Sequence, residues 1–229
     1  MYETIVVSTP ATGVAMITLN RPEAANALNT RMGEELLAAW GAVNSQPDLR
    51  AVILAGAGRH FAAGADLKER NGMSDGAWEA QHRIFEAMIR AQLACPVPVV
   101  GAVQGAAMGG GCEMALACDI VYADETARFG LPEAGLGIMP GLGASQLLPR
   151  AVGPKLALEI MTARRIVIAT EALAWGLVNG VTAPEELAAK TQAVAEDVAR
   201  NAPLSVRSLE TVMGRGVELP LADGMALEI

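Results

Sequence analysis

The chain has 229 residues, of which 52% are hydrophobic and 18% charged, and its formal net charge is −8. This length and apolar content exclude a disordered chain and predict one large globular core. The acidic balance argues against nucleic acid as a partner, and no apolar stretch approaches the roughly 20 residues of a membrane-spanning helix. The first residues show no basic region ahead of an apolar run, so we expect no signal peptide and a cytoplasmic protein.

Strands and helices alternate in the first part of the sequence. Turn residues at 9–13 predict a hairpin between the first two strands, and Asn29 and Ser74 are suited to cap helices. The expected strands are 4–8, 14–19, 51–55, 97–103 and 120–122. The expected helices are 30–45, 75–93 and 109–118. Strand, glycine-bearing turn and helix thus recur in the same order, which indicates an α/β core.

Beyond Gly143 the pattern is helical nearly throughout, with an interruption at 177–182 and helices expected at 185–200 and 204–213. We therefore predict an α/β core over 1–183 and a helical C-terminal region over 184–229. The last residues read as an unfinished helix, so we expect the sequence to continue beyond them.

Cysteine and histidine give no sign of a metal site. Cys95, Cys112 and Cys118 have apolar or small neighbours and no C-x-x-C spacing, which predicts reduced thiols. His60 and His82 lie apart from other ligand-type residues at metal-binding spacing.

Two glutamates, Glu113 and Glu133, each follow a glycine-rich turn in an otherwise apolar stretch. Burying a carboxylate is costly unless a partner or a function offsets the cost. Two carboxyls in one apolar pocket take different pKa values, so one can hold a proton while the other accepts one. Simpler explanations exist, since Glu113 could complement a helix dipole and Glu133 could be a solvated loop carboxylate.

Three segments, 20–29, 61–68 and 105–143, stand in an order and spacing that resemble the crotonase family, the enoyl-CoA hydratase/isomerase superfamily. The resemblance runs from about Ile5 to Asn179 and implies a spiral of repeated β-β-α units followed by C-terminal helices. It further implies hydration of a 2-enoyl-CoA to a 3-hydroxyacyl-CoA, with Glu113 helping to activate water and Glu133 delivering a proton to C2. The backbone N–H groups of Ala65 and Gly110 would form the oxyanion hole for the thioester carbonyl.

The same resemblance implies the contacts with coenzyme A and substrate. These are Ala24, Asn26, Ala27, Leu28, Ala63, Gly64, Asp66, Leu67, Lys68 and Pro132. Lys68 is a candidate phosphate partner, although it could equally be a solvated lysine. Apolar side chains from 71–93 would line the acyl pocket. No cofactor is expected, because coenzyme A is part of the substrate, and a homotrimer or a dimer of trimers is expected.

Other functions have less support. The run Gly109–Met114 lacks the third glycine of a dinucleotide-binding turn, and Ser145 does not lie in a nucleophile elbow. Within the superfamily, Δ3,Δ2-enoyl-CoA isomerases commonly keep only the glutamate matching Glu133, so Glu113 favours a hydratase, and an isomerase or another acyl-CoA lyase is the alternative. A non-catalytic acyl-CoA-binding protein is the alternative of a different class. The stretch Gly143–Leu147 also lacks a basic residue that family members often carry there, which leaves a subunit or substrate contact open.

Overall fold

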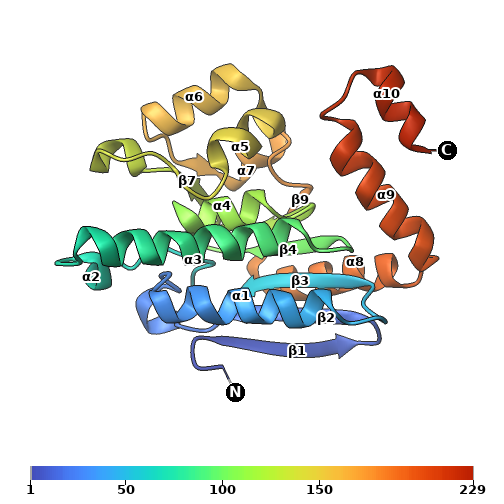
Figure 1. The fold of residues 1–229 in the computed structure, drawn as a ribbon, viewed down its shortest axis with the longest axis horizontal. Coiled ribbons are helices and arrows are strands. Elements are labelled where there is room, and N and C mark those ends of the chain that lie inside the picture. Colours follow the sequence, from blue (N-terminus) through green and yellow to red (C-terminus); the bar gives the residue numbers. More distant parts are fainter. Residues whose placement is uncertain (1, 229) are drawn as a thin grey trace.

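The computed structural model describes residues 2–228 as two sheets surrounded by helices (Figure 1). The larger sheet has the strand order β1-β2-β3-β4-β6-β9. Its strands are β1 (Ile5–Ala11), β2 (Val14–Leu19), β3 (Ala51–Gly56), β4 (Val99–Val103), β6 (Ile120–Asp124) and β9 (Gly180–Thr182). Strands β1 and β2 form an antiparallel hairpin, and the other neighbours pair in parallel. The central strands β3 and β4 are buried almost throughout, which explains their continuous apolar sequences.

The smaller sheet contains β5 (Ala106–Met108), β7 (Arg128–Gly130) and β8 (Val167–Ile168). Two isolated parallel bridges extend it, one between Leu28 and Ala65 and one between Ala62 and Ala107. Successive turns of the chain therefore place one strand in the larger sheet, one short extended segment in the smaller sheet, and then a helix. This arrangement confirms the predicted spiral of β-β-α units.

Helices cover the sheets and form the C-terminal part of the chain. The α-helices are α1 (Thr30–Asn44), α2 (Leu67–Arg70), α3 (Asp75–Leu93), α4 (Gly110–Leu116), α5 (Ala144–Val152), α6 (Pro154–Thr162), α7 (Ala169–Ala174), α8 (Leu187–Ala199), α9 (Pro203–Gly216) and α10 (Leu221–Met225). The 3-10 helices are η1 (Pro22–Ala24), η2 (Glu133–Leu136), η3 (Pro184–Glu186) and η4 (Ala226–Glu228). The predicted caps are confirmed, because Asn29 accepts a hydrogen bond from Met32 N and Ser74 from Ala77 N.

The structure differs from the sequence-based prediction at several short elements. The predicted turn at 9–13 is narrower, since β1 continues to Ala11, and Pro10 is tolerated because β1 is an edge strand. Strand β4 begins only after Pro98. Glu133 opens a 3-10 helix where a loop was expected. The short strands β5 and β7 were not predicted.

The C-terminal helices divide into two parts. Helix α8 packs against β3, β4 and β6, whereas α9 has no buried side chain and extends with α10 along one side of the molecule (Figure 1). The boundary proposed at residue 183 stays a prediction. Helix α8, which follows this boundary, covers part of the larger sheet. Among the described residues, no helix combines the length and apolarity required to cross a membrane.

All three cysteines have free thiols. Cys95 and Cys112 are buried and Cys118 is half-buried. Burial raises the pKa of the Cys95 thiol to about 12, so the thiol stays protonated at neutral pH and packs as a small apolar side chain.

Candidate active site

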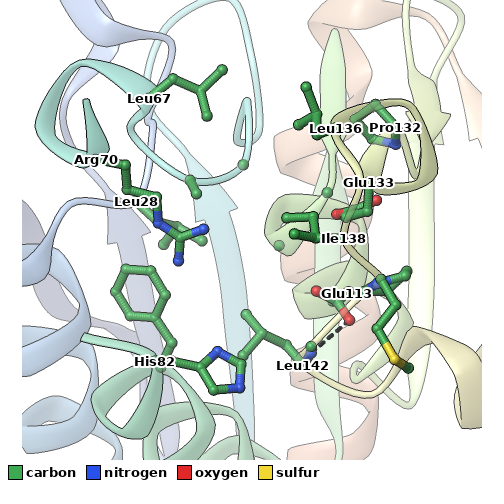
Figure 2. A pocket seen from close by; sticks show the side chains of 18 of the residues that line it. Leu28, Leu67, Arg70, His82, Glu113, Pro132, Glu133, Leu136, Ile138 and Leu142 are labelled. Atoms are coloured by element: carbon green, nitrogen blue, oxygen red, sulfur yellow. Dashed lines mark hydrogen bonds between the residues drawn. The ribbon is translucent and has the colours of Figure 1, made fainter. Parts of the chain in front are cut away.

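A cavity of about 740 Å³ lies where successive turns of the spiral meet (Figure 2). Its walls come from the 63–65 segment, the first turn of α4, η2 with the following loop 137–143, and side chains of α2 and α3. The predicted site residues that line it are Leu28, Ala63, Gly64, Ala65, Leu67, Gly110, Glu113, Pro132 and Glu133. Segments far apart in the sequence thus meet around one space of the size of a typical ligand pocket.

Glu113 lies in the first turn of α4 and is 2% exposed. Its Oε1 accepts hydrogen bonds from the backbone N–H groups of Leu142 (2.7 Å) and Ala144 (3.1 Å). Ala144 is the first residue of α5, so this helix directs an N-terminal amide at the carboxylate. Burial raises the pKa of the Glu113 carboxyl, the two amides oppose that rise, and the negative charge of Glu133 adds to it.

Glu133 is the first residue of η2 and is 8% exposed. Its Oε2 is buried without a hydrogen-bond partner among the described residues, and burial raises the pKa of its carboxyl. The other carboxyl oxygen of Glu133, Oε1, lies next to Gly109. A Cβ at position 109 would lie 2.8 Å from this oxygen. Gly109 also has a φ of 50° and a ψ of −123°, a conformation that residues with a side chain rarely adopt. Both the backbone conformation and the lack of space therefore favour glycine at this position.

Ala65 and Gly110, the residues predicted to form the oxyanion hole, also line the cavity. The neighbouring amides of Leu28 and Asp66 are used in the bridge between Leu28 and the 64–66 segment. Ala65 N and Gly110 N have no hydrogen-bond acceptor among residues 2–228. Gly64 lets the 63–65 segment approach the end of β5, since its φ is 89° and a Cβ there would lie 2.7 Å from Met108 O. Two residues of the cavity wall thus have a backbone N–H without an acceptor among the described residues, and their role as an oxyanion hole stays a prediction.

The two carboxyls occupy one wall of the cavity but differ in their environments (Figure 2). Two backbone donors stabilise the anionic form of Glu113, while Glu133 Oε2 has none among the described residues. Hydrogen bonds to a charged form favour that form, and burial without them favours the neutral form. The arrangement is suited to an ionised base at Glu113 and a proton donor at Glu133.

The remaining predicted contacts lie outside the cavity wall. Ala24, Asn26 and Ala27 lie in or after η1, and Asn26 is completely buried. The Asn26 amide donates to Ala57 O and His60 O, and its Oδ1 accepts from Arg21 N, so its side chain fixes the loop that carries Leu28.

Asp66 caps α2 and pairs with Arg21 at 3.0 Å, while Lys68 is exposed. Contacts with coenzyme A stay predictions for all five residues outside the cavity wall, namely Ala24, Asn26, Ala27, Asp66 and Lys68.

Several residues of the cavity were not singled out from the sequence. Arg70, Trp78 and His82 line it beside Phe85, and the loop 137–143 forms a further wall. The rings of Trp78 and His82 are stacked, with centroids 5.2 Å apart and an interplanar angle of 7°. Of the residues in 71–93, Trp78, His82 and Phe85 line the cavity, and that this wall holds the acyl group stays a prediction. Arg70 gave no sequence signal because Lys68-Glu69-Arg70 reads as a solvated charged run.

The described residues contain no group of three or more His, Cys, Asp or Glu side chains placed to hold a metal ion.

Comparison with known proteins places this geometry in a family. The sequence matches the family model described as Enoyl-CoA hydratase/isomerase over residues 9–229. A "Probable enoyl-CoA hydratase" of Rhizobium meliloti is 42% identical over 230 residues, which cover 99% of this chain and 87% of the relative. A "Short-chain-enoyl-CoA hydratase" of Clostridium acetobutylicum is 39% identical over 216 residues, or 94% of this chain and 83% of the relative.

The fold agrees with this sequence similarity. A crystal structure of an enoyl-CoA hydratase from Bacillus anthracis superposes with a TM-score of 0.96 at 37% identity, covering 99% of this chain and 88% of that one. Family model, relatives and fold agree over nearly the whole sequence, and the chain therefore belongs to the enoyl-CoA hydratase/isomerase family, the crotonase superfamily.

Proposed function

We propose that the protein is an enoyl-CoA hydratase, which adds water across the 2,3 double bond of a 2-enoyl-CoA to give a 3-hydroxyacyl-CoA. The observation that carries the proposal is the pair of buried carboxyls on one wall of a cavity, whose lining also includes Ala65 and Gly110, two residues with backbone N–H groups without acceptors among the described residues. Relatives that are named enoyl-CoA, short-chain-enoyl-CoA or crotonyl-CoA hydratases support the same reaction.

The thioester carbonyl oxygen accepts hydrogen bonds from Ala65 N and Gly110 N. Negative charge develops on this oxygen as water adds to C3, and preorganised donors stabilise that charge by about 3 kcal/mol each in comparable sites. Gly64 and Gly109 set the backbone that aims the two amides.

Glu113 accepts a proton from the attacking water, because its two backbone donors favour the ionised carboxylate. Glu133 delivers a proton to C2, because burial without a partner for Oε2 favours its neutral form. General acid and base catalysis of this kind contributes typically 10²- to 10⁴-fold each. Coenzyme A extends from the cavity along Leu28, Ala63 and Leu67, with Lys68 as a candidate phosphate partner at the exposed start of α2.

A Δ3,Δ2-enoyl-CoA isomerase is the second candidate. Glu133 Oε2 has no partner among the described residues, so this single carboxyl could carry a proton between C2 and C4 of a 3-enoyl-CoA. The isomerase reading leaves unexplained why α5 and the loop before it direct two amides at Glu113. Another acyl-CoA lyase, or a protein that binds acyl-CoA without reaction, is a further alternative.

The test is an absorbance assay of the conjugated enoyl-thioester with short, long and branched 2-enoyl-CoAs, with mass spectrometry of the product. We expect loss of the conjugated chromophore and a mass gain of one water. Conversion of a 3-enoyl-CoA to its 2-enoyl isomer without hydration would favour the isomerase. Tight binding without turnover of any thioester would favour the non-catalytic alternative.

We also propose a homotrimer or a dimer of trimers. Apolar side chains of α9 and α10 lie on the surface, including Leu204, Met213 and Leu221 at 79%, 66% and 81% exposure. Neighbouring apolar side chains exposed on the surface are typical of an interface between chains. A stable monomer at micromolar concentration in sedimentation would contradict the proposal. A cytoplasmic location and the absence of a nucleic-acid partner stay predictions from the sequence.

A further inference from the structure

The loop that holds Glu113 buries little of itself. Of residues 134–141, Pro140 alone is buried, and Ile138 and Met139 are 45% and 68% exposed. The donors to Glu113 Oε1 nevertheless come from the end of this loop, at Leu142, and from the start of α5. A segment with so few buried side chains opens easily unless another part of the fold holds it. The geometry around Glu113 therefore depends on what packs against the loop.

The imidazole of His82, on α3, packs against the loop at Gly141. A Cβ built at position 141 would lie 2.6 Å from His82 Cε1 and 3.5 Å from each of the two ring nitrogens. Figure 2 shows the ring beside the part of the loop that carries Leu142, and both residues line the cavity. The ring thus contacts the backbone of the residue immediately before Leu142 and leaves no space for a side chain there.

Helix α3 keeps this ring in place. Trp78 lies one helical turn before His82, and the two rings are stacked at 5.2 Å with an interplanar angle of 7°. The same helix packs against α1 and buries Phe85 and Met88. Stacking on a large ring restricts the rotation of the imidazole, and a helix packed into the core moves little. His82 is therefore a fixed contact for a loop that is otherwise exposed.

The contact matters because Gly141 and Leu142 stabilise the charge of Glu113. The N–H groups of both residues, together with that of Ala144, lower the pKa of the Glu113 carboxyl against the effect of burial. Such donors act only at hydrogen-bond distance. If the loop moves away from α4, Glu113 loses these donors and binds a proton more readily.

We propose that His82 is a positioning residue, whose ring holds the backbone of Gly141 so that the following amides stay on the carboxylate of Glu113. In this role the imidazole transfers no proton and touches no reacting atom. The catalytic consequence rests on the proposed hydratase function, whereas the link from His82 through the loop to Glu113 does not.

Amide hydrogen exchange, followed by mass spectrometry, tests this link without any substrate. In His82→Ala, peptides that contain Leu142 and Ala144 should exchange at least about tenfold faster than in the unaltered protein, while peptides of α1 stay unchanged. Arg83→Ala alters an exposed neighbour on α3 and should leave the loop unchanged. Unchanged exchange of the loop in His82→Ala would overturn the proposal, whatever the activity.

Gly141→Ala tests the same contact from the other side and leaves α3 intact, so it serves even if His82→Ala fails to fold. The φ of Gly141 is not positive, so the backbone accepts alanine and the conflict lies with the ring. This variant should also speed exchange of the loop. In the double variant the methyl group occupies space that the ring has vacated, so its effect should be smaller than the product of the two single effects. Effects that multiply would overturn the contact.

Where hydration is observed, His82→Ala should lower kcat roughly 10- to 100-fold, as expected when a catalytic group is displaced by about 1 Å. Affinity for butyryl-CoA, a saturated and unreactive thioester, should stay within a few-fold in titration calorimetry. A larger loss of butyryl-CoA affinity than of kcat would overturn the proposal, because it would place the role of His82 in substrate binding.

The pH profile of kcat/KM separates positioning from general loss of structure. Glu113 must be ionised to accept a proton, so fewer donors raise its pKa and should move the acid limb to higher pH by about one unit, which is a tenfold effect. The alkaline limb, set by protonated Glu133, should stay in place. Because Gly141→Ala keeps the imidazole, a shift shared by both variants cannot come from titration of His82. A fall in kcat with an unmoved acid limb in both variants would overturn the proposal.

The two readouts distinguish this proposal from the proposed function. Faster exchange of the loop in a protein that hydrates no enoyl-CoA would reject the hydratase function and keep the role of His82. Hydration with unchanged exchange would do the reverse.

Discussion

Gly109→Ala should lower hydratase activity by displacing one atom of the candidate site, Glu133 Oε1. Gly109 has φ 50° and ψ −123°, a conformation that costs a residue with a side chain about 1–3 kcal/mol. The new Cβ would lie 2.8 Å from Glu133 Oε1, whereas ordinary contacts begin near 3.4 Å. The carboxyl must therefore retreat by about 0.6 Å. A misplacement of about 1 Å can reduce turnover 10²-fold, so we expect kcat for a 2-enoyl-CoA to fall at least tenfold.

Steady-state hydration and thermal unfolding of the same samples measure this effect, and two glycines serve as controls. Gly72→Ala places a side chain at a φ of 85° with no atom within 4 Å, so it should lower stability without lowering kcat. Gly76→Ala lies in α3 with no close neighbour and no positive φ, so it should leave kcat unchanged without lowering stability, since alanine favours a helix more than glycine does. Unchanged kcat in Gly109→Ala, with the stability loss of Gly72→Ala reproduced, would refute the reasoning about Glu133.

Two further predictions concern stability. Glu133→Gln should raise the melting temperature at neutral and alkaline pH, because burial raises the pKa of this carboxyl and the charged form is destabilising in the folded state. The gain should shrink as the pH falls through the raised native pKa and vanish below the ordinary value of 4.5, and a gain independent of pH would contradict it. Asn26→Ala should lower the free energy of unfolding by roughly 2–4 kcal/mol in urea denaturation, because the buried Asn26 side chain is lost and two half-buried carbonyls and one amide lose their partner. Asn201→Ala, on the surface, is the matched control, and equal effects of the two changes would contradict the role of Asn26.

The long elements of the fold could be predicted because their signals are local. Asn29 and Ser74 mark helix starts through side-chain hydrogen bonds to amides three residues on, and the buried strands β3 and β4 are continuous apolar runs. The strands β5 and β7 could not be predicted, because three residues are too few to show a period of two. They form only because neighbouring turns of the spiral supply their partners.

Some residues of the candidate site could likewise be predicted from local sequence, and others could not. Glu113 and Glu133 could be found because carboxylates after glycine turns in apolar stretches are unusual, and the structure places both on one cavity wall. The position of Arg70 could not be found, because its placement depends on Gln81 and on rings of another helix. The two carbonyl partners of Asn26 lie more than 30 residues away, so no local pattern indicates that its side chain secures a loop.

The most direct test of the central claim compares the unaltered protein with Glu113→Gln and Glu133→Gln in hydration of a 2-enoyl-CoA. Each substitution keeps the shape and hydrogen bonding of the side chain while removing its proton transfer. If both carboxyls serve one hydration, each variant should lose at least about 10² in kcat and bind the unreactive acyl-CoA within a few-fold of the unaltered protein. Full hydratase activity in Glu113→Gln would contradict the account, and loss of 3-enoyl-CoA isomerisation in Glu133→Gln alone would show a single-carboxyl isomerase.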